Sequence, residues 1–232
     1  MPSDMEIVLY LAIYSTIFIS ICSLLRNKKI AGRALREYIW PVRLCLAGAM
    51  VGVSIGYLSI FHSEIGLVVH QLVWAMMSAF SAVILVYYHK FTMKNLVVLG
   101  VLFSLWIHGA KCSLRYFVYG VSDPQFRTAE YIASRFVMGS IIVFAAIFIT
   151  ALAIFLINEI NKKERNVKKI SLLVLSIAVT LVVLFLAAKI YYPEWDIMGN
   201  LFSRGPIIIA VIFVAILGTA IEYYVKRTKK AK

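Results

Sequence analysis

Charge is scarce in this sequence, and acidic charge is the scarcest. Only 15% of the 232 residues are charged, and Asp and Glu together number 11 against 24 Lys and Arg. Disordered chains combine low hydrophobicity with abundant charge, so this composition excludes a disordered protein. The three cysteines, Cys22, Cys45 and Cys112, are too few for a disulfide framework. A small secreted domain stapled by disulfides is therefore excluded as well.

Short motifs that carry catalytic chemistry are also missing. The sequence has no H-E-x-x-H or C-x-x-C pattern and no glycine-rich phosphate loop, and its one G-x-S-x-G pattern, residues 52–56, lies inside an apolar stretch. No carboxylate lies in the middle of an apolar stretch, although proton- and sodium-coupled pumps rely on such groups as relays. The sequence therefore favours a non-enzymatic protein over an enzyme, and it does not favour an ion-coupled pump.

Apolar residues are what the sequence has in excess, at 62% of the chain. Soluble domains contain about 45–50%, and a soluble domain of this size could not bury the surplus. A membrane-spanning helix needs about 20 mainly apolar residues. Seven stretches satisfy this requirement, namely residues 7–25, 44–61, 66–88, 96–115, 131–157, 170–188 and 206–224.

These seven stretches predict an all-α polytopic membrane helix bundle, because barrel strands would be shorter and would alternate in polarity. The fourth stretch is the least certain to cross, since its helix must carry Lys111 to the membrane interface. No composition shift or linker separates the stretches. We therefore expect a single integral membrane domain over residues 1–232.

The distribution of Lys and Arg between the loops predicts the orientation. With the N-terminus outside, 18 of the 24 cations lie on the inner side, whereas seven of the 11 acids lie outside. Cytoplasmic loops of membrane proteins carry the excess of Lys and Arg. We therefore expect a plasma- or inner-membrane protein with its N-terminus outside and its C-terminus in the cytoplasm. The net charge of +13 is then explained by topology and does not indicate a nucleic-acid partner.

The first inner loop, residues 26–43, carries six of these cations. Its apolar residues recur at helical spacing before Trp40 and Pro41, which fits a short interfacial helix that Pro41 ends. Such a helix would contact anionic lipids at the cytoplasmic face. The alternative is a loop that only sets the topology.

A doubled G-x-x-x-G pattern in the second stretch, formed by Gly48, Gly52 and Gly56, predicts close helix packing. Residues four apart share one helix face, so a second backbone can approach there. Two neighbours fit this face. One is the third stretch of the same chain, through Ala75, Ser78, Ala79 and Ala82, and the other is a membrane-protein partner or a second copy of the chain.

The candidate functional residues gather near the expected outer ends of the third, fourth and fifth stretches. Ionisable groups within a bilayer usually face the bundle interior or a wet cavity, and they mark functional sites. The residues that we expect to bind a ligand are His70, Trp74, His108, Lys111, Arg115 and Arg135.

Several interpretations of these residues remain open. The first is an outward-facing vestibule that binds or translocates a small anionic or amphipathic ligand through the three cations. The second is a b-type haem with His70 and His108 as axial ligands. The third is a set of cations that reach the outer headgroups without further function. A different class is a non-catalytic interaction protein, such as an accessory subunit or a viral or host-modifying membrane component, which would use the glycine face and the basic inner surface.

Overall fold

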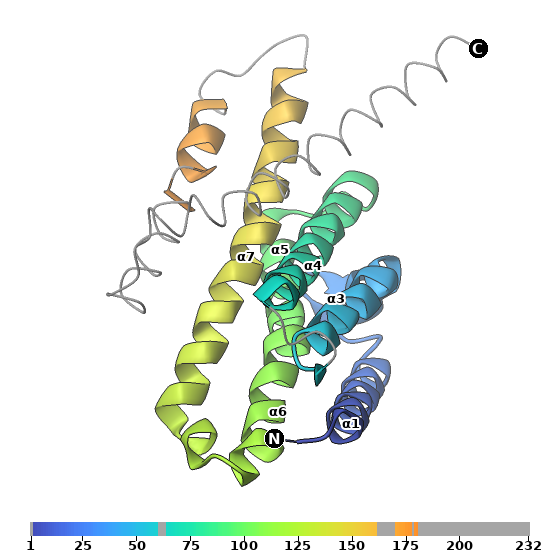
Figure 1. The fold of residues 1–232 in the computed structure, drawn as a ribbon. Helices are drawn as coiled ribbons and strands as arrows, with labels where there is room; N and C mark the ends of the chain where they lie inside the picture. The colour runs from blue at the N-terminus through green and yellow to red at the C-terminus, as the bar shows by residue number, and fades with distance from the viewer. Residues whose placement is uncertain (1, 60–63, 162–169, 178, 181–232) are drawn as a thin grey trace, which may run out of the picture. The chain divides into compact units, whose positions relative to one another are not determined.

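The computed structural model describes residues 2–59, 64–161, 170–177 and 179–180, without the side chains of residues 64–69, and it is mostly helical there (Figure 1). The chain divides into two compact units, Met1–Ile147 and Phe148–Lys232. In the described residues, five helices are long and apolar enough to cross a membrane, namely Asp4–Leu24, Leu35–Ile55, His70–Tyr88, Met93–Val121 and Ala129–Ile160. The helical, apolar class expected from composition is therefore that of the structure.

Two predicted spans are not tested by these helices. The stretch 206–224 lies outside the described residues, and only 170–177 and 179–180 of the stretch 170–188 are described, as helix. The total of seven spans, the single domain and the orientation therefore stay predictions. The first five predicted spans each overlap one of the observed helices.

Helix α1, Asp4–Leu24, begins with a capping box. The Ser3 hydroxyl accepts a hydrogen bond from the Glu6 backbone N–H at 3.3 Å, and the Glu6 carboxylate accepts one from the Ser3 backbone N–H at 2.7 Å. This arrangement satisfies two donors that a helix start leaves without partners. Only Ile7 and Leu11 of α1 are buried. Because its other apolar side chains lie on the surface, α1 has the composition of a lipid-facing helix.

The prediction of an interfacial helix in the loop of residues 26–43 is wrong for the first part of this loop. Two short antiparallel strands stand there, β1 (Lys29–Ile30) and β2 (Arg33–Ala34), and Ala31 and Gly32 between them both have positive φ angles of 50° and 84°. Two successive positive φ angles are those of a tight hairpin turn. Because an α-helix requires negative φ angles, a helix cannot continue through Ala31 and Gly32, although the spacing of the apolar residues favours one.

Pro41 also does not end a helix. The chain runs from α2 (Leu35–Ile39) through the 3₁₀ turn η1 (Trp40–Val42) into α3 (Arg43–Ile55). Pro41 lies in the first turn of η1, where its missing N–H costs no hydrogen bond. The second spanning helix therefore begins at Leu35, before the predicted residue 44.

Helix α3 packs closely against α4, Glu64–Val83, which continues into the π-helical turn η3, Ile84–Tyr88. A methyl group placed on Gly48 would lie 2.9 Å from the Met77 sulfur, and one on Gly56 would lie 2.7 Å from the His70 ring. A methyl on Gly52 would lie 2.9 Å from Val73 and 3.2 Å from the backbone nitrogen of Trp74. The expectation that α4 meets these glycines through Ala75, Ser78, Ala79 and Ala82 is therefore wrong, because the nearest atoms belong to larger residues on a different face of α4.

The fourth predicted span is continuous in the structure. It consists of α5 (Met93–Ser104), the π-helical turn η4 (Leu105–Gly109) and α6 (Ala110–Phe117). The Tyr14 hydroxyl of α1 donates a hydrogen bond to the Leu105 carbonyl at 2.6 Å, and the Trp106 indole donates one to the Leu46 carbonyl of α3 at 2.8 Å. Helices α1 and α3 are therefore both attached to η4. Two 3₁₀ turns, η5 (Tyr119–Val121) and η6 (Pro124–Arg127), lead to α7, Ala129–Ile160.

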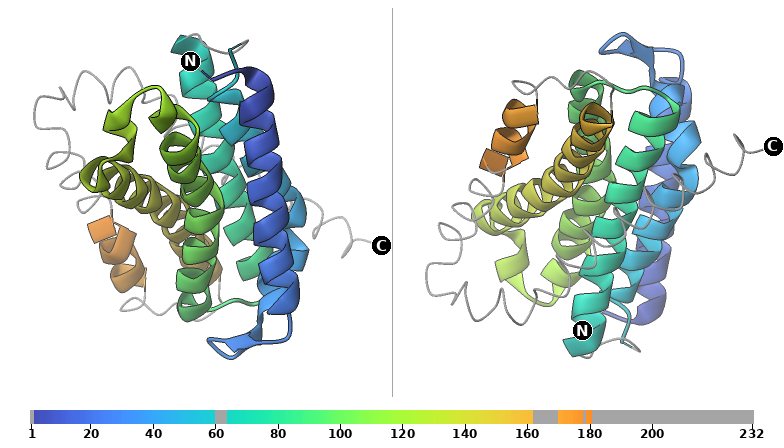
Figure 2. Two further views of the ribbon diagram at one scale, coloured as in Figure 1. Left: turned by 90° about the horizontal axis from the view of Figure 1, so that it is seen from below. Right: turned by 90° about the horizontal axis from the view of Figure 1, so that it is seen from above.

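The connections between the first four spans alternate between two ends of the bundle, as Figure 2 shows for the N-terminus and the hairpin. At the N-terminal end, Asp4 accepts hydrogen bonds from the Ser59 backbone and hydroxyl at 2.8 and 2.5 Å. At the hairpin end, the Arg33 guanidinium donates a hydrogen bond to the His89 carbonyl at 3.0 Å. Each end is thus tied together by polar side chains from different connections.

Candidate functional site

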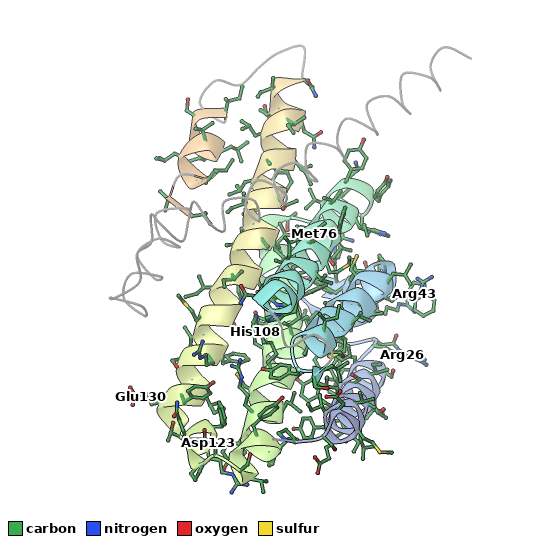
Figure 3. All side chains as sticks on the ribbon, in the orientation of Figure 1. Arg26, Arg43, Met76, His108, Asp123 and Glu130 are labelled. Carbon is green, nitrogen blue, oxygen red and sulfur yellow. The ribbon has the colours of Figure 1, made fainter. Side chains whose placement is uncertain are left out.

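Trp74, His108 and Lys111 form the centre of the candidate site. The rings of Trp74, on α4, and His108, in η4, meet edge to face with their centroids 5.1 Å apart. The Lys111 ammonium, on α6, lies 5.3 Å from the centre of the Trp74 ring. All three residues are buried, with exposed fractions of 2% for Trp74, 3% for His108 and 8% for Lys111. The structure thus brings three predicted residues together in the interior, where Figure 3 labels His108.

The two arginines of the predicted set lie against tyrosines. The Arg115 guanidinium lies 5.6 Å from the centre of the Tyr57 ring and 5.8 Å from that of Tyr131. The Arg135 guanidinium lies 5.3 Å from the centre of the same Tyr131 ring. Each of the three predicted cations therefore contacts an aromatic ring.

The rings of His70 and His108 each pack against a glycine of a neighbouring helix. Gly56 of α3 leaves room for the His70 ring, and Gly139 of α7 leaves room for the His108 ring, since a methyl group at either glycine would overlap the imidazole. His108 also lies in the π-helical turn η4, and such turns rotate the following residues relative to a regular helix. Helices α3, α4, α6 and the first part of α7 thus all contribute to the site.

Sequence reasoning missed Tyr57, Tyr131 and Gly139. Tyr57 and Tyr131 lie near the ends of predicted spans, where aromatic residues are common for reasons unrelated to a site. A weak signal existed for Gly139, since it stands beside Ser140 in an otherwise bulky apolar stretch. Small residues in a spanning helix favour a close contact.

The cluster contains much more positive than negative charge. Within the described part of the chain, no carboxylate forms an ion pair with Lys111, and the ion pair between Arg33 and Glu37 at 3.3 Å lies at the hairpin end. The acidic residues labelled in Figure 3, Asp123 and Glu130, lie near the junction of α6 and α7, apart from His108. The structure therefore presents a buried ammonium group whose contact is an aromatic ring.

The site does not fit a haem held by His70 and His108. The His108 ring is in contact with Trp74 and with the backbone of Gly139, and the His70 ring is against Gly56. A porphyrin between the imidazoles would require α3, α4 and α7 to separate. Among the described residues there is also no group of three or more His, Cys, Asp or Glu that could hold a metal ion.

Comparison of the chain with protein-family models, with curated proteins and with solved structures gave no match.

Proposed function

We propose that this membrane protein binds a small anionic ligand at the cluster of Lys111, Arg115 and Arg135. This cluster would lie in a vestibule that opens to the outer side of the membrane. The observation that carries the proposal is the burial of Lys111, which forms no ion pair with an acid among the described residues. The position of the cluster toward the N-terminal end supports an outward opening, provided that the N-terminus is outside as the loop charges predict.

Energetics favour a negatively charged ligand. Burying an unpaired ammonium group costs several kcal/mol, whereas a contact with an aromatic ring returns about 1–2 kcal/mol. The Trp74 ring therefore offsets only part of the cost of burying Lys111. An anion bound beside the ammonium group would offset the rest, and a guanidinium group such as that of Arg115 can form two parallel hydrogen bonds with a carboxylate or phosphate.

Charge reversal tests this function. The Lys111→Glu/Arg115→Glu protein should lose binding of glycerol 3-phosphate and lactate, measured by calorimetry on protein in lipid nanodiscs. The matched control is Lys28→Glu/Lys29→Glu, which changes the same charge in the exposed hairpin connection and should bind as the wild type does.

A second variant guards against misfolding in that experiment. Lys111→Gln/Arg115→Gln removes the positive charges without adding negative ones, and it should lower the affinity at least tenfold, about 1.4 kcal/mol, with an unchanged elution volume in size exclusion. Wild-type affinity in both double variants, or no anion binding by the wild-type protein, would refute the proposal.

A second surface supports a separate proposal, contact with anionic lipid headgroups at the hairpin end. The exposed cations there are Arg26, Lys28, Lys29, Arg36, Arg43, Lys90 and Lys94, and Figure 3 shows Arg26 and Arg43 on the outside of the molecule. Trp40 is 69% exposed, and the Arg43 guanidinium lies 4.5 Å from the centre of its ring. Exposed Trp and Arg side chains together are typical of the headgroup level of a membrane.

This surface also bears on the interaction-protein alternative. The glycine face that would have bound a partner helix is occupied by α4 of the same chain, so the basic end remains as the surface for an external contact. Lys28→Gln/Lys29→Gln/Arg36→Gln should reduce the enrichment of phosphatidylglycerol over phosphatidylcholine around the protein, at about 1 kcal/mol per cation. Native mass spectrometry of the lipids retained from mixed nanodiscs measures this, and unchanged enrichment would contradict the proposal.

A further inference from the structure

Several buried polar atoms in the described part of the chain have no hydrogen-bond partner in the protein. They include the Tyr57 hydroxyl, the Trp74 indole nitrogen, the Ser104 hydroxyl, the Nε2 atom of His108 and the Ser140 hydroxyl. Leaving a buried donor or acceptor without a partner costs about 1–3 kcal/mol. Such groups are rare in native proteins, and each needs a physical explanation.

These atoms are not scattered over the molecule. The Trp74 and His108 rings are in contact, and Ser104 precedes His108 by four residues on the same helical segment. Ser140 follows Gly139, which the His108 ring contacts. The residues that carry them are therefore the two rings themselves or residues one turn or one position from the contacts of His108.

Tyr57 belongs to the same region through different neighbours. Its ring lies beneath the Arg115 guanidinium, and it follows Gly56, which contacts His70. The residues that carry the unpartnered atoms thus belong to the segments that also hold the cations and rings of the candidate site.

Buried serines just outside this region are bonded normally. The Ser78 hydroxyl donates a hydrogen bond to the Trp74 carbonyl at 2.9 Å, and the Ser81 hydroxyl donates one to the Met77 carbonyl at 2.8 Å. A serine hydroxyl in a helix can readily bond the carbonyl four residues earlier. Ser104 and Ser140 are helical too, yet their hydroxyls make no such bond. Their polar groups are therefore available to something other than the helix backbone.

We infer that the ligand of this site is a hydrophilic organic anion, whose anionic group is joined to hydroxyl or carbonyl groups, and not an anionic amphiphile with an apolar tail. This inference rests on the proposed function, because it assigns the anionic group to the cations. The Trp74 indole only donates and needs an oxygen acceptor, whereas serine hydroxyls both donate and accept. Hydroxyl and carbonyl oxygens on the ligand match this set, and an alkyl chain would leave every one of these atoms unpartnered.

Two matched pairs of anions test the inference. Glycerol 3-phosphate and propyl phosphate share the phosphate group and the chain length, and lactate and propionate share the carboxylate and the chain length. For at least one pair, the wild-type protein in nanodiscs should bind the hydroxylated member about tenfold or more tightly, since a hydrogen bond of about 1–1.5 kcal/mol corresponds to roughly that ratio. Calorimetric titration measures both members.

The possible outcomes distinguish a failure of this inference from a failure of the proposed anion-binding function. Equal affinities within every pair that binds would overturn the inference and leave the anion-binding function standing. Tighter binding of the alkyl member in every pair that binds would overturn it in the same way. If no member of either pair binds, the proposed function and the inference fail together.

Variants connect the preference to the named atoms. Ser104→Ala/Ser140→Ala should bring the affinity ratio of the hydroxylated to the alkyl anion toward one while retaining affinity for the alkyl member. Trp74→Phe should also bring this ratio toward one, although it changes the ring beside Lys111 and so also changes the affinity for both anions. Ser81→Ala is the matched control, because its hydroxyl is bonded to the backbone, and it should keep the wild-type ratio. An unchanged ratio in both test variants would contradict the inference.

Stability without ligand gives a second measurement that does not depend on binding. Removing an unpartnered hydroxyl from the interior also removes its desolvation cost. Ser104→Ala/Ser140→Ala should therefore unfold at the same temperature as the ligand-free wild type or at a higher one. A lower unfolding temperature would show that these hydroxyls have partners within the protein, and it would overturn the inference.

Discussion

At the residue scale, Asn95 and Lys111 are both buried, but they differ in how the protein satisfies their polar groups. The Asn95 amide nitrogen donates hydrogen bonds to the Ala31 carbonyl at 3.0 Å and to the Tyr38 hydroxyl at 2.9 Å. Its amide oxygen accepts from the Thr92 backbone N–H at 3.1 Å and from the Thr92 hydroxyl at 2.9 Å. Its hydrogen-bonding capacity is thus largely used within the protein, which is typical of a structural residue, whereas Lys111 contacts a ring.

Asn95→Asp should therefore destabilise the fold. The carboxylate keeps the shape of the side chain but loses the two donated bonds to Ala31 and Tyr38, at a cost of about 1–3 kcal/mol. Thermal unfolding in detergent micelles should show a lower midpoint. Asn27→Asp is the matched control, since Asn27 is exposed, and its midpoint should equal that of the wild type. Equal midpoints for all three proteins would contradict the structural role of Asn95.

The sequence indicated which cations share a helix face but not what lies beneath them. Lys111 and Arg115 are four residues apart, so their common face follows from helix geometry. Their aromatic neighbours Trp74, Tyr57 and Tyr131 come from other helices. Which ring lies under which cation depends on how the helices are rotated, and local spacing contains no such information.

At the element scale, the α3–α4 pair shows why three glycines in one pattern are not equivalent. Gly48 faces the flexible thioether of Met77, whereas Gly52 faces the branched carbon of Val73 and the backbone of Trp74. A flexible methionine can move away from an added methyl group, but a helix backbone moves only with the whole helix. The same sequence motif therefore tolerates different changes at each position.

Gly52→Ala should destabilise the protein more than Gly48→Ala does. Overpacking against a rigid neighbour costs about 1–3 kcal/mol, and we expect Gly48→Ala to cost less than about 1 kcal/mol because the thioether can repack. Unfolding midpoints in detergent compare the two variants directly. An equal loss of stability in both would contradict the packing described for α3 and α4.

The same variants distinguish internal packing from a partner contact. Because α4 occupies the glycine face, neither substitution should change the oligomeric state of the detergent-solubilised protein, measured by light scattering after size exclusion. Dissociation of an oligomer in Gly52→Ala alone would favour the alternative in which this face binds another chain.

At the scale of the whole molecule, charge is unequal between the two ends of the bundle. At the hairpin end, the connections of residues 26–43 and 89–94 carry exposed Lys and Arg side chains and one acidic residue, Glu37. The N-terminal end carries Asp4, Glu6, Asp123 and Glu130 together with the cations of the candidate site and Arg127. This difference is what predicts a cytoplasmic hairpin end and an outer N-terminal end.

Cysteine labelling tests this orientation. In a background lacking Cys22, Cys45 and Cys112, Ser3→Cys and Ser122→Cys should react with a membrane-impermeant maleimide added outside intact cells. Asn27→Cys and His89→Cys should react only after the membrane is permeabilised. All four positions are exposed, so unequal labelling reports sidedness. External labelling of Asn27→Cys or His89→Cys would show that the predicted orientation is inverted.

The sequence by itself determined the helical and strongly apolar class, the approximate position of the first five apolar helices and the unequal charge of the two ends. These are properties of residues counted along the chain, and a bilayer requires an apolar spanning segment to satisfy its own backbone as a helix. The tertiary structure decided what the glycines pack against, that Pro41 continues a helical segment, and that Lys111 lies buried on an indole. These features join residues distant in sequence, as in the contact between Tyr57 and Tyr119, 62 residues apart. They depend on how each helix is rotated against its neighbours, which only packing of the whole bundle can select.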